Sequence, residues 1–477
     1  MPLWWSLDAA PGPGTAAARG ALFGAVAYAG GHAWLFRLVP VFLAGDWVFG
    51  SLVWGLYGVA FSACFAAYGA LYAALRRAGT GRGSAGVAGW VAMEWLQPLV
   101  FPVHAGSAAI DPVLLAQTAE LGGPLLLSAG VAWLNLAVYE AWRGARGLAP
   151  LPWARIAATG CLFAAAVAFG QWRIAGFEAR IARAEPVRVG LVQANLGLLE
   201  KRTAVETGHR QHLAQSRELL ADGPLDLLIW PETAYARALR GPLPLAGQMV
   251  RREIDVPLLF GGTLIEDPGD GPVQTNAALL VGSDGVVRDA YRKNLLIPLA
   301  ERVPFLDRVP ALAQRLPRAQ RFGAARQVPA LSLGERRISV PICYEAIRPG
   351  FVRRMVRAAE PHLLVTIAND AWFGDSREPL IHLQLARMRA IEHRRHLVRA
   401  TNGGISAIID PLGRVVARTA LLERANLRGQ ITWLAEPTLY TRLGDWPGPL
   451  AALWLVVALR IATPRRAARA ATRPGAA

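Results

Sequence analysis

Long apolar runs with almost no charged residues dominate this sequence. The longest extends from Trp47 to Leu75 without a single Asp, Glu, Lys or Arg. A bilayer core of about 30 Å is crossed by about 20 helical residues, and apolar runs of this length are typical of membrane spans. The sequence therefore predicts five transmembrane helices in its first part, at Gly20–Phe36, Trp47–Leu75, Ser84–Val103, Leu121–Tyr139 and Ile156–Trp172.

These runs also divide the chain into domains. We expect a membrane domain of about five transmembrane helices over residues 1–178 and a separate domain over residues 185–440. A shorter apolar run predicts a last transmembrane helix over residues 446–463, provided that arginine at its end reaches the interface. A basic cytoplasmic tail over residues 464–477 is expected to follow it.

The positive charges indicate how the chain crosses the membrane. The net charge is +17, from 51 Lys and Arg against 34 Asp and Glu, which is typical of nucleic-acid-binding proteins or of membrane proteins with basic cytoplasmic loops. Arginines follow the second, fourth and last runs, as at Arg76, Arg143 and Arg465, whereas the loop His104–Glu120 has no Lys or Arg. Because cytoplasmic loops carry the excess of basic residues, we expect a cytoplasmic N-terminus, an extracytoplasmic residue range 174–445 and no nucleic-acid partner.

The composition argues against a purely soluble protein, and the cysteines argue against a fold held by disulfides or by a structural zinc ion. Only 18% of the residues are charged and 53% are hydrophobic, whereas soluble proteins carry about a quarter charged residues. The three cysteines, Cys64, Cys161 and Cys343, form no CxxC pair and have no metal-ligand spacing. A disulfide framework and a structural zinc site are therefore not expected, and we expect no metal ion and no cofactor.

Between the fifth and sixth apolar runs, short apolar segments alternate with amphipathic ones. Strands are predicted at Val187–Gln193, Leu225–Trp230, Leu258–Gly262, Ala277–Val281, Ile338–Ile342 and Leu363–Ile367, and helices at Thr207–Leu220 and Pro379–Arg395. Two segments, Ala278–Tyr291 and Ser406–Arg418, have the order strand, glycine-containing turn and strand that is typical of a β-hairpin. The pattern predicts an α/β sandwich.

Three polar residues that follow predicted strands could form a catalytic site. Glu232 lies in the sequence WPET, Lys293 in YRKNLLIP and Cys343 in VPICYE. A thiol nucleophile needs a base to accept its proton and a positive group to stabilise the oxyanion, and these residue types supply both. Each residue also has a structural explanation, because the cysteine could pack in the core, the glutamate could cap a helix and the lysine could lie at the surface.

Two features of the sequence favour catalysis over these structural roles. Cys343 is the only cysteine outside the apolar runs, and Lys293 is one of two lysines in the chain, the other being Lys201. Arginine fills the remaining basic positions. Lysine is therefore expected where a planar guanidinium does not replace a compact ammonium.

Several motifs, taken in order, resemble one family. The segments WPET, YRKNLLIPLAERVPF, PICYE and NDAWFGDS, together with MEWL, MRAIEHRRHLVRATNGG and LYTRLGDWP, are similar to the nitrilase superfamily and to its membrane-bound branch, apolipoprotein N-acyltransferase. The resemblance covers nearly the whole chain, from about Gly20 to Pro447. It implies a polytopic α-helical membrane domain joined to an extracytoplasmic α/β nitrilase-like αββα sandwich, in the inner (cytoplasmic) membrane of a bacterium with the catalytic domain on the periplasmic side.

The resemblance also implies a reaction and the residues that perform it. Cys343 would take an acyl chain from a phospholipid donor as a thioester and pass it to the N-terminal amine of a diacylglyceryl apolipoprotein acceptor. Glu232 would move the protons, while Lys293 and the backbone N–H of Tyr344 would stabilise the oxyanion. The full set that the family carries onto this sequence is the catalytic triad Glu232, Lys293 and Cys343 with the supporting residues Glu301, Tyr344 and Glu345.

Two other functions stay open at this point. A membrane-tethered nitrilase-type amidase, acting on a small amide or nitrile, would use the same three residues but would need no more than a membrane anchor. A catalytically inactive membrane-assembly protein would need none of the three. Activity of the α/β domain alone would favour the amidase, and a requirement for phospholipid would favour the transferase.

Other polar residues carry weaker expectations. Glu94, the acidic residue of its apolar run, is expected either to be functional or to form a hydrogen bond between helices. His382 and the other histidines are too scattered in the sequence to predict a metal site. The remaining expectation is a solvated helix face formed by Arg387, Arg394 and Arg395.

Overall fold

The computed structural model of the chain describes residues 2–42, 47–98, 100–102, 104–241, 243–267, 269, 271–298, 301–302 and 322–471. Its internal contacts separate two compact units. The helical unit comprises Met1–Phe36, Val48–Trp172 and Leu443–Ala477, and the α/β unit comprises Arg37–Trp47 and Arg173–Arg442. The last part of the predicted cytoplasmic tail, residues 472–477, lies outside the described residues.

The helical unit contains several long apolar helices. Among the described residues, three are long and apolar enough to cross a membrane, at Gly50–Arg77, Ala119–Ala145 and Trp153–Arg183, and Pro447–Ile461 is a shorter apolar helix. The number of spans and the predicted domain bounds stay predictions. The described α-helices of this unit are α1 (Pro2–Asp8), α2 (Pro13–Gly31), α3 (Ala33–Phe42), α4 (Trp47–Arg77), α5 (Gly89–Leu96), α6 (Val113–Ala116), α7 (Ala119–Ala145), α8 (Trp153–Arg183) and α16 (Pro447–Ala471). Three of them, α3, α4 and α8, include residues of the other unit.

The third predicted helix is shorter in the structure than in the prediction. The π-helical turn η1 (Ser84–Ala88) continues into α5, which ends at Leu96 because Gln97 adopts an extended conformation. Pro98 follows, and proline disfavours the helical conformation for the residue before it. The carboxylate of Glu94 accepts hydrogen bonds from Trp90 Nε1 at 2.6 Å and from the backbone N–H of Ala105 at 2.8 Å. It therefore joins α5 to the turn that follows.

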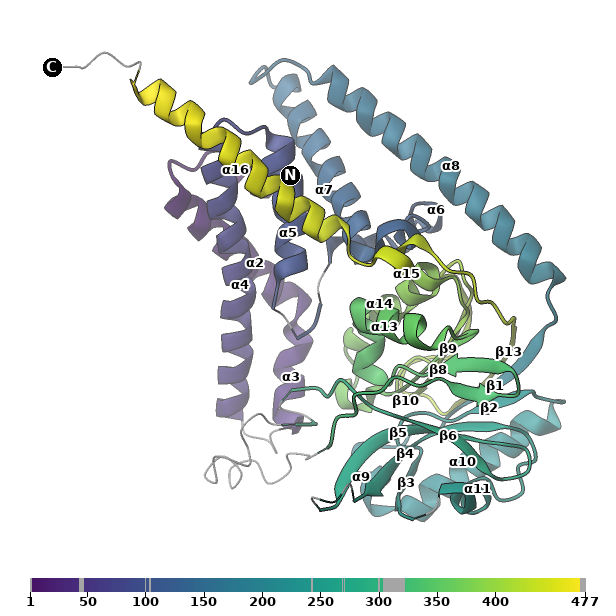
Figure 1. Cartoon of the computed structure of the whole chain (residues 1–477). Helices are drawn as coiled ribbons and strands as arrows, with labels where there is room; N and C mark the ends of the chain where they lie inside the picture. The colour runs from purple at the N-terminus through teal and green to yellow at the C-terminus, as the bar shows by residue number, and fades with distance from the viewer. Residues whose placement is uncertain are drawn as a thin grey trace. The chain divides into compact units, whose positions relative to one another are not determined.

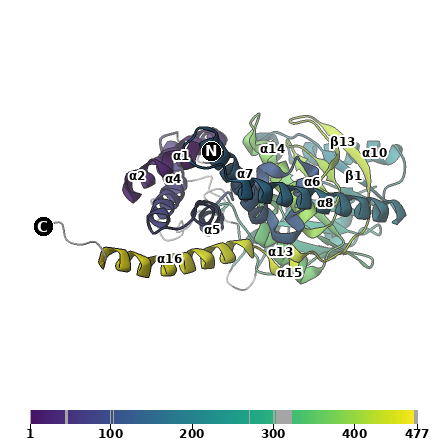
Figure 2. The same ribbon diagram turned by 90° about the horizontal axis from the view of Figure 1, so that it is seen from above.

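Small residues allow α2 and α4 to pack closely in the helical unit. The two helices lie side by side in both ribbon views (Figures 1 and 2). A Cβ atom at Gly69 would lie 2.3 Å from the carbonyl oxygen of Ala16, so that position needs glycine. Such close contacts between small residues are typical of helices that associate within a membrane.

The α/β unit contains two sheets. Within the described residues, one sheet has the strand order β13-β1-β2-β4-β5-β6 with β3 beside β4, and the other has the order β12-β11-β10-β9-β8-β7. β1, β2 and β4 run parallel, as do β8, β9 and β10. The strands are β1 (Val187–Gln193), β2 (Leu227–Ile229), β3 (Tyr235–Leu239), β4 (Leu258–Glu266), β5 (Val273–Val281), β6 (Val287–Arg292), β7 (Leu331–Leu333), β8 (Arg336–Ser339), β9 (Leu363–Asn369), β10 (Leu397–Asn402), β11 (Ala407–Ile409), β12 (Val415–Arg418) and β13 (Ala425–Ile431).

Helices cover the outer faces of both sheets. The helices α10 (Val205–Ala221) and α11 (Leu243–Arg251) pack on the first sheet, and α13 (Pro349–Ala359) and α14 (Glu378–His393) pack on the second (Figure 1). Alternating residues of each strand face the two layers, since successive side chains of a strand point in opposite directions. In β2, Leu227 and Ile229 lie in the core between the sheets, whereas Leu228 packs with the helical layer. This arrangement confirms the expected αββα sandwich.

Most predicted strands and both predicted hairpins occur in the structure. β1 coincides with its prediction, and the pairs β5–β6 and β11–β12 are antiparallel. The strand predicted at Ile338–Ile342 is displaced, because β8 ends at Ser339. Pro341 has no N–H to donate to a neighbouring strand, which explains the early end.

The expectation of a solvated helix face formed by Arg387, Arg394 and Arg395 is wrong for the last two of these residues. Arg394 and Arg395 are 0% and 3% exposed. Helix α14 ends at His393, and Arg394 then adopts a left-handed conformation with φ 52°, which turns the chain toward the interior. Arg394 donates to the carbonyl oxygen of Pro411 at 3.0 Å, and its guanidinium lies 5.0 Å from the ring centre of Phe177.

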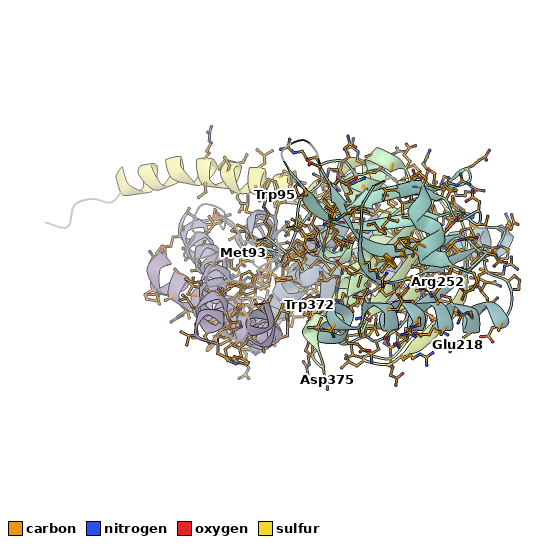
Figure 3. The ribbon with its side chains drawn as sticks, turned by 90° about the horizontal axis from the view of Figure 1, so that it is seen from below. Met93, Trp95, Glu218, Arg252, Trp372 and Asp375 are labelled. Atoms are coloured by element: carbon orange, nitrogen blue, oxygen red, sulfur yellow. The ribbon has the colours of Figure 1, made fainter. Side chains whose placement is uncertain are left out.

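Charged side chains of the α/β unit are instead paired on its outer helices. Glu218 on α10 and Arg252, just after α11, both project from this layer (Figure 3). Glu218 pairs with Arg424 and Arg252 pairs with Glu206, each at 2.8 Å. Exposed pairs of this kind contribute about 0–1 kcal/mol to stability, so the fold depends on its buried layers rather than on them.

Candidate active site

Glu232 and Lys293 meet at one edge of the first sheet. They follow β2 and β6, which run in the same direction, so both strands end at the same edge. The Nζ atom of Lys293 lies 3.3 Å from Oε1 of Glu232 and 2.7 Å from Oε1 of Glu301, and the lysine side chain is 1% exposed. A Cβ atom at Gly261 of β4 would lie 2.6 Å from Cα of Glu232, so glycine is needed for this approach.

Two further buried residues complete the cluster, and the sequence reasoning missed both. Lys201, from α9 (Leu198–Thr203), donates from Nζ to the backbone carbonyl oxygen of Glu232 at 2.8 Å. Asn276 donates from Nδ2 to Oε1 of Glu232 at 2.7 Å and to Oε1 of Glu301 at 3.4 Å. Both lysines of the chain therefore contact Glu232. The rarity of lysine could have identified Lys201, whereas Asn276 had no comparable signal.

The charges in this cluster balance, with two ammonium groups facing two carboxylates. Burial lowers the pKa of Lys201 to about 8, although Glu232 opposes this shift. Burial also acts to lower the pKa of Lys293, but Glu232 and then Glu301 outweigh it and hold that pKa well above its ordinary value. Lys293 is therefore a permanent cation beside Glu232, whereas Lys201 changes its charge near pH 8.

Cys343 begins a short turn after the second sheet's β8. The turn, η4, spans Cys343–Ile347, and its first residue has a φ of 50°. This left-handed conformation is uncommon for a residue other than glycine and costs about 1–3 kcal/mol. The residue is 5% exposed. Burial raises the pKa of the thiol well above its ordinary value, Glu232 raises it further, and Lys293 opposes both. The sulfur is thus a neutral thiol at rest that needs a base.

Glu345 ties the turn of the cysteine to the loop that follows the lysine. Its carboxylate accepts hydrogen bonds from the backbone N–H groups of Ile342, Asn294 and Leu295 at 2.8, 2.6 and 3.0 Å. The hydroxyl of Tyr291 donates to it at 2.8 Å. Burial raises the pKa of Glu345 to about 7, opposed by these backbone donors. Glu345 therefore holds the two loops together and acts as a positioning residue.

The other two predicted supporting residues lie in the same two loops. Glu301 accepts a hydrogen bond from the backbone N–H of Ile297 at 2.9 Å in addition to its pairing with the lysine. The Tyr344 hydroxyl accepts a hydrogen bond from Arg348 at 3.4 Å. The predicted role of the Tyr344 backbone N–H toward an oxyanion stays a prediction.

A network from the second sheet holds the cysteine turn from the other side. Nε2 of His382 lies 3.2 Å from the carbonyl oxygen of Cys343, and Nδ1 lies 3.1 Å from Oδ1 of Asp370. Arg399 donates to Oδ2 of the same aspartate at 2.7 Å. Asp370, Glu378 and His382 are close enough to share a cation, but the Arg399 guanidinium already balances Asp370. We interpret the network as support for the cysteine backbone.

This arrangement suits acyl transfer. A buried thiol needs a base, and the carboxylate of Glu232 is close enough to influence the pKa of Cys343. A permanent cation at Lys293 can stabilise a developing oxyanion where water is excluded. The chemistry fits a substrate with an electrophilic carbonyl, such as an ester or an amide, and leaves the choice between them to other observations.

Comparison with known proteins identifies relatives of this chain. The carbon-nitrogen hydrolase family matches residues 188–431, and the apolipoprotein N-acyltransferase N-terminal domain matches residues 1–137. The apolipoprotein N-acyltransferase of Geobacter metallireducens is 30% identical over 89% of this chain and 83% of that protein. The one of Pseudomonas aeruginosa is 31% identical over 93% of this chain and 87% of that protein.

Among solved structures, Saccharomyces cerevisiae Nit3, a member of branch 10 of the nitrilase superfamily, aligns with 52% of this chain and 90% of its own, at 16% identity and a TM-score of 0.41. The two relatives extend over the helical unit as well as the α/β unit. The family match to residues 188–431 lies within the α/β unit, and the match to residues 1–137 lies mostly within the helical unit. The chain therefore belongs to the apolipoprotein N-acyltransferase family.

Proposed function

We propose that this enzyme transfers an acyl chain from a phospholipid to the N-terminal diacylglyceryl-cysteine of bacterial lipoproteins. The observation that carries the proposal is the buried cluster in which Lys293 lies between Glu232 and Glu301 and electrostatically influences Cys343. The acyltransferase relatives support the choice of substrates, since they match the helical region that an amidase of small soluble amides would not need.

In the first half-reaction, Cys343 becomes acylated. Glu232 accepts the thiol proton while the sulfur attacks the ester carbonyl of the phospholipid, and the carbonyl electrons move onto oxygen. Lys293 and the backbone N–H of Tyr344 stabilise this oxyanion. When the tetrahedral intermediate collapses, the ester C–O bond breaks, and Glu232 returns the proton to the oxygen of the departing lysophospholipid.

In the second half-reaction, the thioester is consumed. The α-amine of the diacylglyceryl-cysteine attacks the thioester carbonyl, and the same donors stabilise the second oxyanion. The C–S bond breaks as the amide forms. Glu232 takes the proton that the amine loses and passes it to the sulfur of Cys343, which restores the resting thiol.

The reaction would take place on the periplasmic side of the bacterial inner membrane. The arginine-rich ends of the apolar runs, at Arg76, Arg143 and Arg465, support a cytoplasmic side that is opposite to the α/β unit. A phospholipid donor and a lipid-modified acceptor are both confined to the membrane, so a membrane-bound enzyme meets them in one plane.

The test supplies the full-length protein with a phospholipid and a synthetic peptide that begins with diacylglyceryl-cysteine. We expect the peptide to gain the mass of one acyl chain, and we expect a lysophospholipid in equal amount. The Glu232→Gln variant, which keeps the shape of the side chain but cannot accept the proton, should form neither product. Release of ammonia from small amides, without any acylated peptide, would instead identify an amidase.

A further inference from the structure

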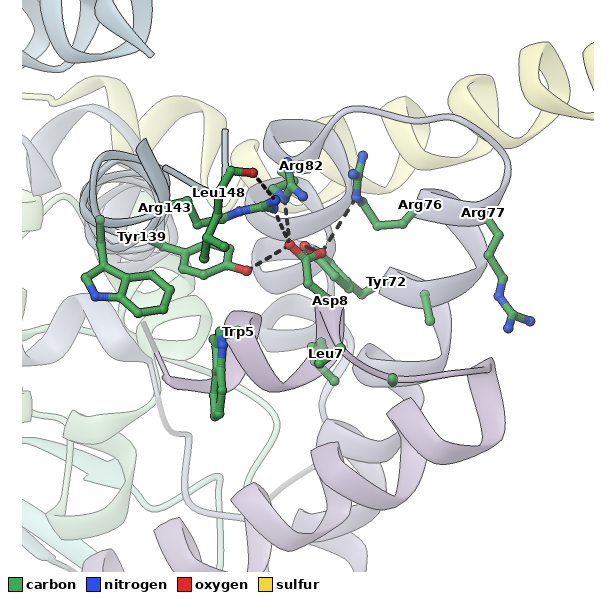
Figure 4. A pocket seen from close by; sticks show the side chains of 14 residues that line it. Trp5, Leu7, Asp8, Tyr72, Arg76, Arg77, Arg82, Tyr139, Arg143 and Leu148 are labelled. Carbon is green, nitrogen blue, oxygen red and sulfur yellow. Dashed lines mark hydrogen bonds and ion pairs between the residues drawn. The ribbon is translucent and has the colours of Figure 1, made fainter. Parts of the chain in front are cut away.

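The helical unit contains a second polar cluster that the reaction does not use. A cavity of about 460 Å³ is lined by residues from α1, α4 and α7 and from the loop that follows each of these helices. Asp8, the last residue of α1, lies among arginine and tyrosine side chains (Figure 4). Four of the residues that line this arginine cavity are cations, namely Arg76, Arg77, Arg82 and Arg143.

Asp8 is the one carboxylate in this cavity lining, and its acceptor positions are filled. The hydroxyls of Tyr72 and Tyr139 donate to it at 2.8 and 2.9 Å. Arg82 Nε and Arg143 Nη1 donate to it at 2.7 and 3.2 Å. Burial alone would raise the pKa of Asp8, but the hydrogen bonds from Arg82 and the two tyrosines hold it below its ordinary value. Asp8 is therefore a permanent anion that balances one arginine.

The remaining positive charge of the arginine cavity has no counterpart in its lining. Arg76 Nε is 3.9 Å from Asp8, and no hydrogen-bond acceptor for this buried nitrogen occurs among the described residues. Arg77 donates to the backbone carbonyl of Pro11 rather than to a carboxylate. The side chain of Arg76 is 28% exposed and that of Arg143 is 21% exposed. Arg76 also donates to the backbone carbonyl of Thr80, so Arg76 and Arg77 both have neutral partners. One carboxylate nevertheless balances only part of the charge of four arginines, so an anion in the cavity would stabilise it.

The shape and surroundings of the cavity indicate which anion fits. Guanidinium groups bind phosphate through paired hydrogen bonds, and the cavity presents several of them. Apolar side chains adjoin the charged part, and Trp5 and Leu148 are 56% and 58% exposed. Such a site accepts a phosphate that is attached to an apolar body. The arginines are also those that place this end of the helical unit on the cytoplasmic side in the proposed topology, where anionic lipids attract basic residues.

We infer that the arginine cavity binds the phosphate group of an anionic phospholipid from the cytoplasmic leaflet. This site belongs to the helical unit, whereas the proposed reaction of the acyl donor and acceptor takes place at the candidate active site of the α/β unit. Basic residues near a membrane also attract anionic lipids in a diffuse way, at about 1 kcal/mol each. Arg146 provides the matched control, because it is exposed, follows α7 closely and does not line the cavity.

The experiment measures lipid retention by native mass spectrometry and lipid-dependent thermal stability on the full-length protein. The Cys343→Ala variant is used as background, so that no acyl transfer consumes the lipid and failure of the proposed reaction leaves this test intact. The probes are phosphatidylglycerol, zwitterionic phosphatidylcholine and soluble glycerol 3-phosphate. Arg76→Gln, Arg77→Gln and Arg146→Gln are compared in that background, and unfolding without lipid verifies that each variant is folded.

We expect the protein to retain one phosphatidylglycerol. The affinity for this lipid should fall at least tenfold in Arg76→Gln or Arg77→Gln and change less than twofold in Arg146→Gln. If Arg76→Gln does not fold, Arg77→Gln provides the test. In the described structure the Arg77 guanidinium donates to the backbone carbonyl of Pro11 and not to Asp8, so its loss leaves the Asp8 interactions in place. Protection by glycerol 3-phosphate as strong as that by lipid would still identify a phosphate site but assign it to a soluble ligand and overturn the lipid assignment. Equal losses in all three variants would overturn the site itself. Equal retention of phosphatidylcholine would overturn the assignment to an anionic phospholipid.

Discussion

Replacing Lys293 with arginine tests whether a compact ammonium is required at the active site. The side chain is 1% exposed and its Nζ atom lies 2.7 Å from Glu301 and 3.3 Å from Glu232. A guanidinium keeps the positive charge, so both carboxylates retain a partner. It is, however, larger and planar, and its nitrogens cannot occupy the position of Nζ while the surrounding strands stay in place.

The expected effect on the reaction is much larger than the effect on the fold. Losing one well-placed oxyanion donor costs about 10²–10³ in turnover, or about 3–4 kcal/mol of transition-state stabilisation. Overfilling a packed site typically costs about 1–3 kcal/mol of stability. Removing the charge altogether would be worse for the fold, since an uncompensated buried carboxylate costs about 3–5 kcal/mol. Arginine is therefore the informative substitution.

The assay is the rate at which the protein gains one acyl mass from phospholipid, measured well below the unfolding temperature of each variant. Lys201→Arg is the matched control, because Lys201 is the other buried lysine and donates a hydrogen bond to the backbone carbonyl of Glu232 rather than to its carboxylate. We expect Lys293→Arg to be slower by about 10²–10³-fold and Lys201→Arg to be affected far less. A Lys293→Arg rate within about threefold of wild type would contradict the proposed role of Lys293 in stabilising the oxyanion, from which the expected loss of about 10²–10³-fold follows.

Three further predictions concern the groups around the triad. Lys201 has a pKa of about 8 in the folded protein, below the ordinary lysine value that applies in the unfolded chain. Between about pH 8 and pH 10 the unfolded chain therefore binds a proton that the folded protein has released. The free energy of unfolding should then rise by about 1.4 kcal/mol per pH unit because of this group. Urea unfolding of wild type and Lys201→Met at both pH values measures this, and an identical pH dependence would contradict it. Glu345→Gln removes the charge from four hydrogen bonds and should lower stability by about 1–3 kcal/mol along with the acylation rate, whereas an unchanged unfolding temperature would exclude a positioning role. His382→Phe removes the contact to the Cys343 carbonyl and should slow acylation by about 10²-fold through misplacement of the sulfur, and a wild-type rate would show that the network does not support the turn.

The layered fold was predictable because several of its strands are short, mostly apolar segments that can be recognised in the sequence. β1 has apolar residues on both faces and both its predicted ends agree with the structure. The strands β3, β7, β10 and β13 were not predicted. β13 mixes polar and apolar residues and is half-exposed along most of its length. The pairing of β13 with β1 and of β3 with β4 is set by the tertiary fold.

The positions of the three candidate residues at the ends of strands were also predictable, but part of their polar surroundings was not. Glu232, Lys293 and Cys343 each follow a strand, which is a local feature of the sequence. Lys201 joins them from α9, and its side chain reaches the site only through the packing of that helix. The buried positions of Arg394 and Arg395 depend on a single left-handed residue after α14, and a helical periodicity that is extrapolated past the helix end assigns them to the wrong environment.

Acylation of Cys343 tests the central claim most directly. The full-length protein is incubated with a phospholipid in the absence of acceptor, and its intact mass is measured together with the masses of Cys343→Ala, Cys64→Ala and Cys161→Ala. We expect one acyl mass on wild type, lost on brief treatment with hydroxylamine as a thioester is, and equally present in Cys64→Ala and Cys161→Ala, whose cysteines lie in helices of the helical unit. The Cys343→Ala protein should gain no mass. An adduct that persists in Cys343→Ala, or no adduct in wild type that still transfers acyl chains to the peptide, would contradict the proposed nucleophile.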